Sequence, residues 1–364
     1  MASRGPRAAT RPSQRPASPP VRDFTAASAS FSIEWDVRPA FDFILSLSED
    51  SGTTDDLPEA DRTWLADALA ALPEASRQFL AHGTPGRMVT IHLAGFLVDH
   101  PELRTAAYVV AAIRATSPED LFPHLVGEMH DVDHAELKRA LAGDRSATDA
   151  ILARVDGHKS EALAGILADP NAAYDGLVAL LEAWAPAFAT VEPRVAGIIQ
   201  RDYDLRAADR ERLGGVELVE QTTGGIRIMP EPAIRRVILA PSYFSRPFNY
   251  LFGGTDWRFA GYPVADAALD VDPLSPPPSV LRLHRALGDA TRLRILKALA
   301  EKDLYGTELA ALLDISKPTV THHMVQLRAA GLVTAVQAGS AVYYSLRRER
   351  LQDALGDLTR FLVG

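Results

Sequence analysis

The sequence predicts an α+β protein, in which a mostly helical N-terminal domain with a small antiparallel sheet precedes a separate C-terminal unit. Three observations lead to this class. Apolar residues recur at helical spacing from Pro39 to about Leu213, and β-branched runs with glycine pairs follow them. Residues 270–279 contain four prolines among polar residues, which predicts a linker. With 364 residues, the chain is long enough for two or three folding units.

The composition is that of a globular protein, with 47% hydrophobic and 23% charged residues. There is no cysteine, which excludes disulfides, thiolate metal sites and cysteine nucleophiles. No apolar run reaches the roughly 20 residues of a membrane helix and no secretory signal is readable, so we expect a cytoplasmic protein with no membrane partner. Residues 31–279 hold 21 basic and 38 acidic side chains, whereas residues 280–364 hold 12 and 8. This contrast indicates different partners for the two parts.

The first ordered element is expected after a tail. Residues 1–30 are rich in Arg and Pro and predict a disordered tail, either without function or serving as an accessory phosphate-binding arm. Phe31, Ile33 and Trp35 alternate with polar residues and predict a short strand. The helices that follow are clearest at residues 64–72 and 177–188. Their candidate N-caps are Asp61, Ser117 and Asp133.

A small sheet is expected at the end of the N-terminal domain, which covers residues 31–269. A β-branched run begins at Val216, and the Gly224-Gly225 pair separates it from residues 226–229, which predicts a hairpin. Residues 234–239 and 257–264 have the composition of two further strands. We expect these strands to form an antiparallel sheet that packs on the helices.

Residues 280–364 predict a compact order of short elements. Ser316 and Pro318 open one of the helices, and Gly331 ends it. In chain order, the predicted elements are helices at 281–287, 291–300, 307–313 and 316–330, strands at 332–337 and 341–346, and a last helix that carries leucines from 351 to 362. Helices, a helix-turn-helix, a hairpin and a last helix together describe a winged helix-turn-helix, a DNA-binding fold.

Residues 286–346 resemble the ArsR family of winged-helix transcriptional regulators. The segments LGDATRLRIL, ELAALLDISKPTVTHHM, LRAAGLV and VYYSL carry the resemblance by their order and spacing. It implies a homodimer that binds double-stranded operator DNA and usually represses transcription. It also implies that the first and last helices of the unit form the dimer interface, and packing of these helices on the N-terminal domain is the alternative. The interface candidates are Leu281, Leu283, Leu351, Leu355, Leu358 and Phe361.

The helix that follows Ser316 is the candidate for insertion into DNA. One stripe of this helix is apolar and should face the domain core; it consists of Val320, Met324 and Leu327. Thr319, His322 and Gln326 then point away from the core and can form hydrogen bonds with base edges in a major groove.

Other side chains in this unit are candidates for contacts with phosphates. Lys317 and Arg328 can neutralise phosphates, and His323 is expected to pack or to position a phosphate. The turn of the wing carries no arginine, although family wings commonly do, and Arg347 and Arg348 lie just past the second wing strand, where they can compensate. The complete set of DNA-binding candidates is Ser316, Lys317, Thr319, Thr321, His322, His323, Gln326, Arg328, Ser340 and Arg347.

No metal or other cofactor is expected. One metal-sensing branch of the family uses paired cysteines at the start of the third helix, where this chain has residues 304–307, LYGT. Another uses Asp and His of the last helix, which here has no histidine. In the N-terminal domain, His130 and His134 lie four residues apart, but the predicted cap Asp133 places them on different elements. We favour an acidic, solvated loop over a metal site there.

The N-terminal domain contains an aromatic-rich stretch from Tyr243 to Phe259, which includes Arg246 and Asn249. This stretch can line a ligand pocket or form the core of the sheet, and we favour the core. No nucleophile elbow, kinase motif or dinucleotide fingerprint is present, so we do not expect an enzyme. We expect the domain to receive an unknown small-molecule or protein effector.

The sequence therefore predicts a DNA-binding transcriptional regulator of repressor type that does not sense metals. The alternative is an interaction or dimerisation protein whose winged helix no longer binds DNA, as the wing without arginine allows. A third possibility is an enzyme in the N-terminal domain with a regulatory C-terminal unit, which no sequence motif supports.

Overall fold

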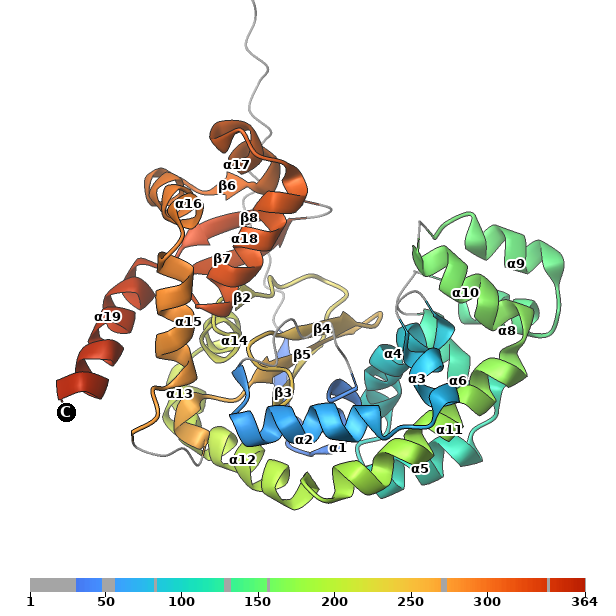
Figure 1. Ribbon diagram of the computed structural model, residues 1–364. Coiled ribbons are helices and arrows are strands. Elements are labelled where there is room, and N and C mark those ends of the chain that lie inside the picture. Colours follow the sequence, from blue (N-terminus) through green and yellow to red (C-terminus); the bar gives the residue numbers. More distant parts are fainter. Residues whose placement is uncertain are drawn as a thin grey trace, which may run out of the picture.

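The computed structural model describes residues 31–47, 56–81, 84–127, 132–155, 158–269, 274–338 and 341–363. It confirms the α+β class, since helices dominate and two four-stranded sheets accompany them (Figure 1). An N-terminal body holds one sheet and most of the helices, and a C-terminal unit follows it. The predicted tail and residues 270–273 of the predicted linker lie outside the described residues. Within the described ranges, no helix is long and apolar enough to cross a bilayer.

The body is built mainly of helices. They are α1 (Ala40–Leu45), α2 (Glu59–Ala70), α3 (Glu74–Leu80), α4 (Pro85–Asp99), α5 (Ala106–Ala115), α6 (Pro118–Phe122), α8 (His134–Leu141), α9 (Arg145–Leu152), α10 (His158–Ala168), α11 (Pro170–Ala189), α12 (Glu192–Leu205), α13 (Ala207–Arg212) and α14 (Gly215–Thr223). A π-helical turn at Pro123–Gly127 and a 3-10 turn at Asp266–Ala268 complete the set.

The predicted N-caps have three different outcomes. Ser117 caps α6 as predicted, because its side chain accepts a hydrogen bond from the backbone N–H of Asp120. Asp133 stands at the N-cap of α8, but its side chain makes no cap hydrogen bond. Asp61 was a wrong choice, since Pro58 is the N-cap of α2 and Asp61 is a buried partner of Arg194 and Tyr243.

The sheet of the body is mixed, so the predicted antiparallel arrangement is wrong. Its order is β1–β3–β5–β4, made of β1 (Ser32–Trp35), β3 (Arg236–Ser242), β5 (Trp257–Pro263) and β4 (Tyr250–Gly253). β3 runs parallel to both β1 and β5, and β4 alone is antiparallel to β5. The reason is the connections: a long helical segment separates β1 from β3, and the unpredicted strand β4 reverses the chain between β3 and β5.

The predicted hairpin around Gly224 is also wrong. Residues 215–223 form α14, whose buried residues Leu218, Val219, Thr222 and Thr223 recur at helical spacing. The packing of this face overrides the strand propensity of valine and threonine. Gly224 ends the helix with a left-handed φ of 70°, as glycine does most easily.

For most of the aromatic stretch, the core of the body confirms the interpretation that we favoured, whereas Phe248 and Asn249 line a hollow. Tyr243, Phe244, Trp257 and Phe259 are buried in one large apolar cluster with residues of most body helices. Trp184 of α11 is fully buried there, and its indole N–H reaches the backbone O of Phe43 at 3.2 Å. These aromatic residues therefore hold the sheet against the helices.

The C-terminal unit has the predicted winged helix-turn-helix order. Its elements are α15 (Pro278–Leu287), α16 (Ala290–Glu301), β6 (Leu304–Tyr305), α17 (Gly306–Leu313), α18 (Lys317–Ala329), β7 (Val333–Ala338), β8 (Ala341–Leu346) and α19 (Arg348–Val363). α15 begins inside the predicted linker, with Pro278 in its first turn, where a missing backbone N–H costs nothing.

A strand of the body completes the sheet of the wing. β2 (Ile226–Arg227) pairs in parallel with β7, which gives the second sheet the order β2–β7–β8–β6. Arg347 reinforces this contact, because its Nη1 donates hydrogen bonds to the backbone oxygens of Gly224 and Gly331, at 2.8 and 3.2 Å. The body and the C-terminal unit therefore share one sheet.

Candidate nucleic-acid interface

The helix-turn-helix is fixed by local capping. α17 ends at Asp314, which adopts a left-handed φ of 55°, a conformation that Asp tolerates better than most residues. Ser316 then caps α18, because its Oγ accepts a hydrogen bond from the backbone N–H of Thr319 at 3.2 Å. This turn sets the direction in which α18 leaves α17.

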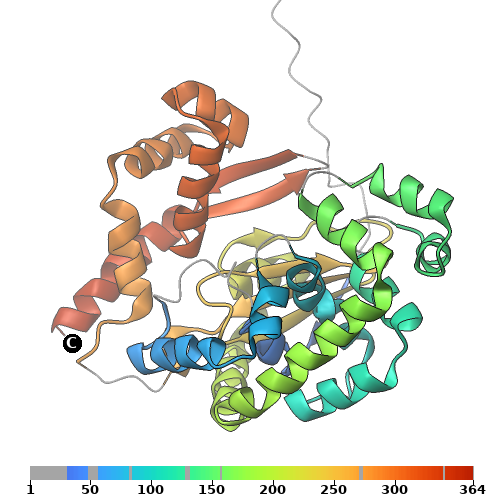
Figure 2. The ribbon, with the colours of Figure 1, turned by 45° about the vertical axis from the view of Figure 1, so that its right-hand side comes forward.

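The two faces of α18 lie as predicted. Val320, Met324 and Leu327 are buried in the core of the C-terminal unit. The first half of the helix presents exposed polar side chains; these are Ser316, Lys317, Thr319, Thr321 and His322. This half lies on the side of the C-terminal unit that faces away from the body (Figures 1 and 2). A cation, hydroxyls and an imidazole are thus gathered on one accessible helix end.

The second half of α18 turns toward the body. Gln326 is only half-exposed, and Arg328 lines a hollow together with residues 223–226 and 247–249 of the body. Arg347 is bonded to the Gly224 turn, and burial lowers its pKa. The predicted phosphate contacts of Arg328 and Arg347 do not fit these positions, since neither belongs to the exposed end. Ser340 lies outside the described residues.

His323 has the packing position that the sequence suggested. It is half-buried on α18, and its Nδ1 makes no hydrogen bond. Burial lowers its pKa, while the nearby Asp289 opposes this change. This half-buried position is consistent with packing against the C-terminal unit.

The candidates for a dimer interface are divided. Leu283 packs in the core of its own unit, and Leu351 packs against that core, so neither is free for a partner. Leu281 is 41% exposed, and Leu358 and Phe361 are half-exposed on α19, which packs beside α15. The side chain of Leu355 lies outside the described residues. The end of α19 adds two exposed apolar side chains that are not among the predicted interface residues. They are Leu362 and Val363, which are 68% and 80% exposed.

A buried ion network holds α15 against the body. Arg246, which is almost fully buried, lies with Nη2 at 3.2 Å from Asp56 and at 2.5 Å from Asp266. Arg282 of α15 bonds the same Asp56, and the backbone N–H of Ser279 donates to Asp266 at 2.8 Å. Burial alone would raise the pKa of Asp266, but the two guanidinium groups hold it below its usual value. The network therefore joins both parts of the chain.

No metal centre is visible where the structure describes the chain, since it brings no three His, Asp or Glu residues together in a ligating arrangement. His134 opens α8 directly after Asp133, as predicted. Glu128, His130 and Asp131 lie outside the described residues, so the predicted acidic loop stays a prediction.

Comparisons with known proteins match the C-terminal unit. Residues 289–335 fit the model described as "Bacterial regulatory protein, arsR family". The HTH-type transcriptional regulator CmtR of Mycobacterium tuberculosis is 41% identical over 85 residues, which are 23% of this chain and 72% of that protein. The transcriptional repressor SdpR of Bacillus subtilis is 33% identical over 80 residues, which are 22% of this chain and 89% of that protein.

Two solved structures resemble the same part of the chain. An ArsR family transcriptional regulator, RHA00566, has 22% identity and a TM-score of 0.21, covering 22% of this chain and 90% of its own. HlyU from Vibrio cholerae has 27% identity and a TM-score of 0.20, covering 24% and 94%. Because these TM-scores are far below 0.5, the assignment to a family rests on the sequence matches.

Proposed function

Since the chain belongs to the ArsR family of bacterial regulatory proteins, we propose that this DNA-binding regulator is a homodimeric repressor that does not sense metals and takes its input through the N-terminal body. The observation that carries DNA binding is the exposed first half of α18. Lys317, Thr319 and His322 are exposed there, and this half of the helix lies away from the body (Figure 1), which leaves it accessible to a major groove.

The case for a homodimer comes from the apolar side chains of α15 and α19. Leu281, Leu362 and Val363 are exposed on these two helices, which pack side by side. A second copy would remove them from water. Two copies related by a two-fold axis would present two α18 helices to a palindromic operator, with half-sites about 10 base pairs apart or a multiple of this distance.

The case against metal sensing comes from the ligands that the sequence offers. There is no cysteine in the chain, and α19 contains Asp353 and Asp357 but no histidine. The cysteine ligands of one branch of the family, and the Asp and His pair of the other, therefore have no counterpart. An input through the body is supported by its size and by its contacts with the C-terminal unit, which include the shared sheet and the ion network around Asp56.

A second candidate is a dimerisation protein that does not bind DNA. Arg328 and Arg347, two of the arginines that the sequence offered for phosphate contacts, both face the body. This leaves fewer cations for the duplex than a typical winged helix has, and phosphate neutralisation supplies most of the non-specific affinity.

A gel-shift titration with the DNA upstream of the protein's own gene separates the two candidates. We expect binding at low salt, and we expect the double substitution His322→Ala with Gln326→Ala to weaken it at least 30-fold. Each lost base contact costs about 1–3 kcal/mol. The control is His134→Ala with Gln200→Ala, the same chemical change at exposed positions of the body, which should leave affinity unaltered. Absence of binding by the unmodified protein would favour the second candidate.

A phosphate contact of Lys317 gives a different signature. Lys317→Ala should weaken binding to the operator and to unrelated DNA by similar factors, because a phosphate contact carries no sequence information. It should also reduce the slope of log K against log salt concentration by about 1. Titrations at several salt concentrations measure both quantities. A loss confined to the operator would contradict the assignment of Lys317 to a phosphate.

A further inference from the structure

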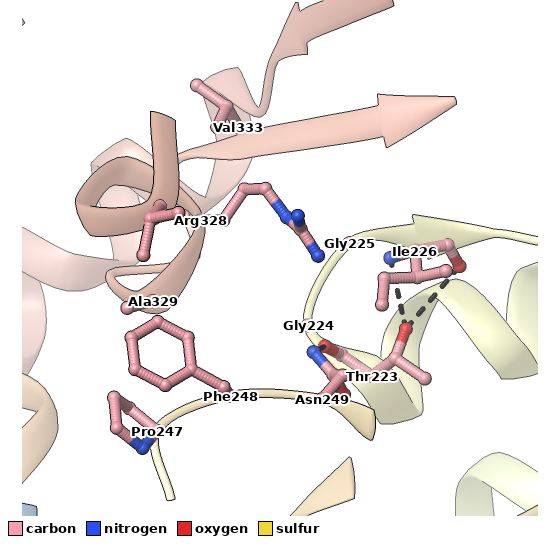
Figure 3. A pocket seen from close by; sticks show the side chains of 11 residues that line it. Thr223, Gly224, Gly225, Ile226, Pro247, Phe248, Asn249, Arg328, Ala329 and Val333 are labelled. Atoms are coloured by element: carbon pink, nitrogen blue, oxygen red, sulfur yellow. Dashed lines mark hydrogen bonds between the residues drawn. The ribbon is translucent and has the colours of Figure 1, made fainter. Parts of the chain in front are cut away.

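A hollow lies where the second half of α18 meets the body (Figure 3). It holds about 490 Å³ of empty space, which includes its open mouth. Its walls come from three places that are far apart in the sequence: the turn after α14, the segment before β4, and α18 with the start of β7. The lining residues are Thr223, Gly224, Gly225, Ile226, Pro247, Phe248, Asn249, Val325, Arg328, Ala329 and Val333.

Arg328 is the only ionised side chain in this lining. Its side chain extends from α18 toward the Gly224-Gly225 turn of the body (Figure 3). Among the described residues it has no hydrogen-bond partner and no ion-pair partner, whereas the neighbouring Arg347 donates to two backbone oxygens. Burial lowers the pKa of Arg328, and no carboxylate of the described residues opposes this effect. A guanidinium has five N–H donors, and none of those of Arg328 has a hydrogen-bond acceptor among the described residues.

The rest of the wall combines apolar side chains with the polar backbone of the turn after α14 and with Asn249. Phe248 and Pro247 stand on the side of the body, and Ala329 on the side of α18 (Figure 3). Val325 of α18 also belongs to the lining. Asn249 adds a second incompletely satisfied polar group: its Nδ2 donates to the backbone O of Thr223 at 2.9 Å, but its buried Oδ1 accepts no hydrogen bond. One unpaired cation beside a group of apolar side chains fits an anionic group that is attached to an apolar body.

We propose that this hollow binds a small organic carboxylate, whose carboxylate group pairs with Arg328 and whose apolar part packs against Phe248 and Val325. The proposal rests on the proposed function, because it names the class of effector that reaches the regulator. A planar guanidinium holds a carboxylate through two parallel hydrogen bonds. An inorganic anion could form similar hydrogen bonds with Arg328, but it has no apolar part to pack against Phe248 and Val325.

The position of the site allows a bound ligand to influence the affinity for DNA. Val325, Arg328 and Ala329 belong to the same helix whose first half is exposed for the duplex, and the opposite wall belongs to the body. A ligand in the hollow therefore contacts both parts at once. It changes the affinity for DNA if it prefers one arrangement of α18 against the body over another.

Titration of the full chain, without DNA, tests the site. The probes are benzoate, its neutral analogue benzamide and inorganic phosphate, at matched ionic strength, with calorimetry or ligand-observed NMR as the readout. We expect saturable binding of benzoate, and at least tenfold weaker binding of benzamide and of phosphate. Arg328→Gln should weaken benzoate at least tenfold, and Arg328→Lys should retain part of the affinity. The control Arg145→Gln makes the same charge change at an exposed position of α9 and should stay within twofold.

Several results would overturn the proposal. These are the absence of benzoate binding, equal affinities for benzoate and benzamide, or an affinity that Arg328→Gln leaves intact. Phosphate binding as tight as benzoate binding would refute the contribution of the apolar wall. A circular dichroism spectrum and melting curve of Arg328→Gln, compared with those of the unmodified protein, show whether this variant is folded.

A gel shift with and without benzoate then tests the coupling separately. We expect benzoate to change the affinity of the unmodified protein for its operator at least threefold, and to have no effect on Arg328→Gln. Unchanged DNA affinity in the presence of bound benzoate would refute the regulatory role of the site. If the protein binds benzoate but no DNA, the proposed function fails while the site stands, so the two failures are distinguishable.

Discussion

Replacing Asp42 by alanine is expected to lower the free energy of unfolding by about 3–5 kcal/mol at pH 8. Asp42 is fully buried in α1 and accepts three hydrogen bonds from the segment after β3. Its carboxylate binds the hydroxyl of Ser242 at 2.6 Å and the backbone N–H groups of Tyr243 and Phe244 at 3.1 and 2.8 Å. Alanine would leave three buried donors without an acceptor, and each costs about 1–3 kcal/mol.

The effect should be large because this carboxylate positions two core aromatic residues. Tyr243 and Phe244 are buried among the helices, and Asp42 holds the backbone that carries them. Burial raises the pKa of Asp42 to about 6, so ionisation of the carboxyl costs the native state more than the unfolded chain, and part of its stabilisation is lost as the pH rises through 6. At pH 8 the acceptor is ionised, and the loss caused by Asp42→Ala should be smaller there than at pH 5.

Urea denaturation followed by far-UV circular dichroism gives the value for Asp42→Ala. Asp67→Ala, an exposed aspartate on α2, is the control and should cost less than about 0.5 kcal/mol. Equal stabilities of Asp42→Ala and the control would show that the three donors find other acceptors.

Asp56→Ala should have the second large effect, a loss of about 3–5 kcal/mol, because it removes the carboxylate that Arg246 and Arg282 share. Arg246 would keep Asp266, but a nearly buried guanidinium would lose one of its two counter-charges. Arg282 would lose its partner, and with it one of the bonds between α15 and the body. We therefore expect the C-terminal unit to unfold at a lower temperature than the body.

Differential scanning calorimetry distinguishes a split transition from a uniform decrease. Asp209→Ala removes a surface partner of Arg212 and is the control, with an expected loss below about 1 kcal/mol. A single, unshifted transition for Asp56→Ala would show that the shared sheet alone couples the two parts.

The C-terminal unit could be predicted almost completely from the sequence, because its signals are local. Ser316 is a cap by its own side chain, Gly331 ends α18 by its positive φ, and the apolar stripe of α18 follows from helical spacing. The same reasoning placed Thr319 and His322 on the outward face, and both are exposed.

The features that depend on long-range packing could not be predicted from the sequence. The direction of β3 and β5 depends on connections that a period of two does not reveal, and the helical residues Val219 and Thr222 have strand propensity. Arg328 lies at the side of a helical wheel, which shows where the core of its own unit is but not where the body approaches. For the same reason, the sequence singled out Asn249 without indicating that it would meet α18.

Because β2 of the body pairs with β7 of the wing, the behaviour of a shortened chain can be predicted. A fragment that begins at α15 would lose Ile226 and Arg227 and would uncover the backbone groups of β7 along one edge. An open strand edge is a template for pairing with other chains, so such a fragment would be prone to self-association through β7. The body thus shields the edge of β7 from pairing with other chains.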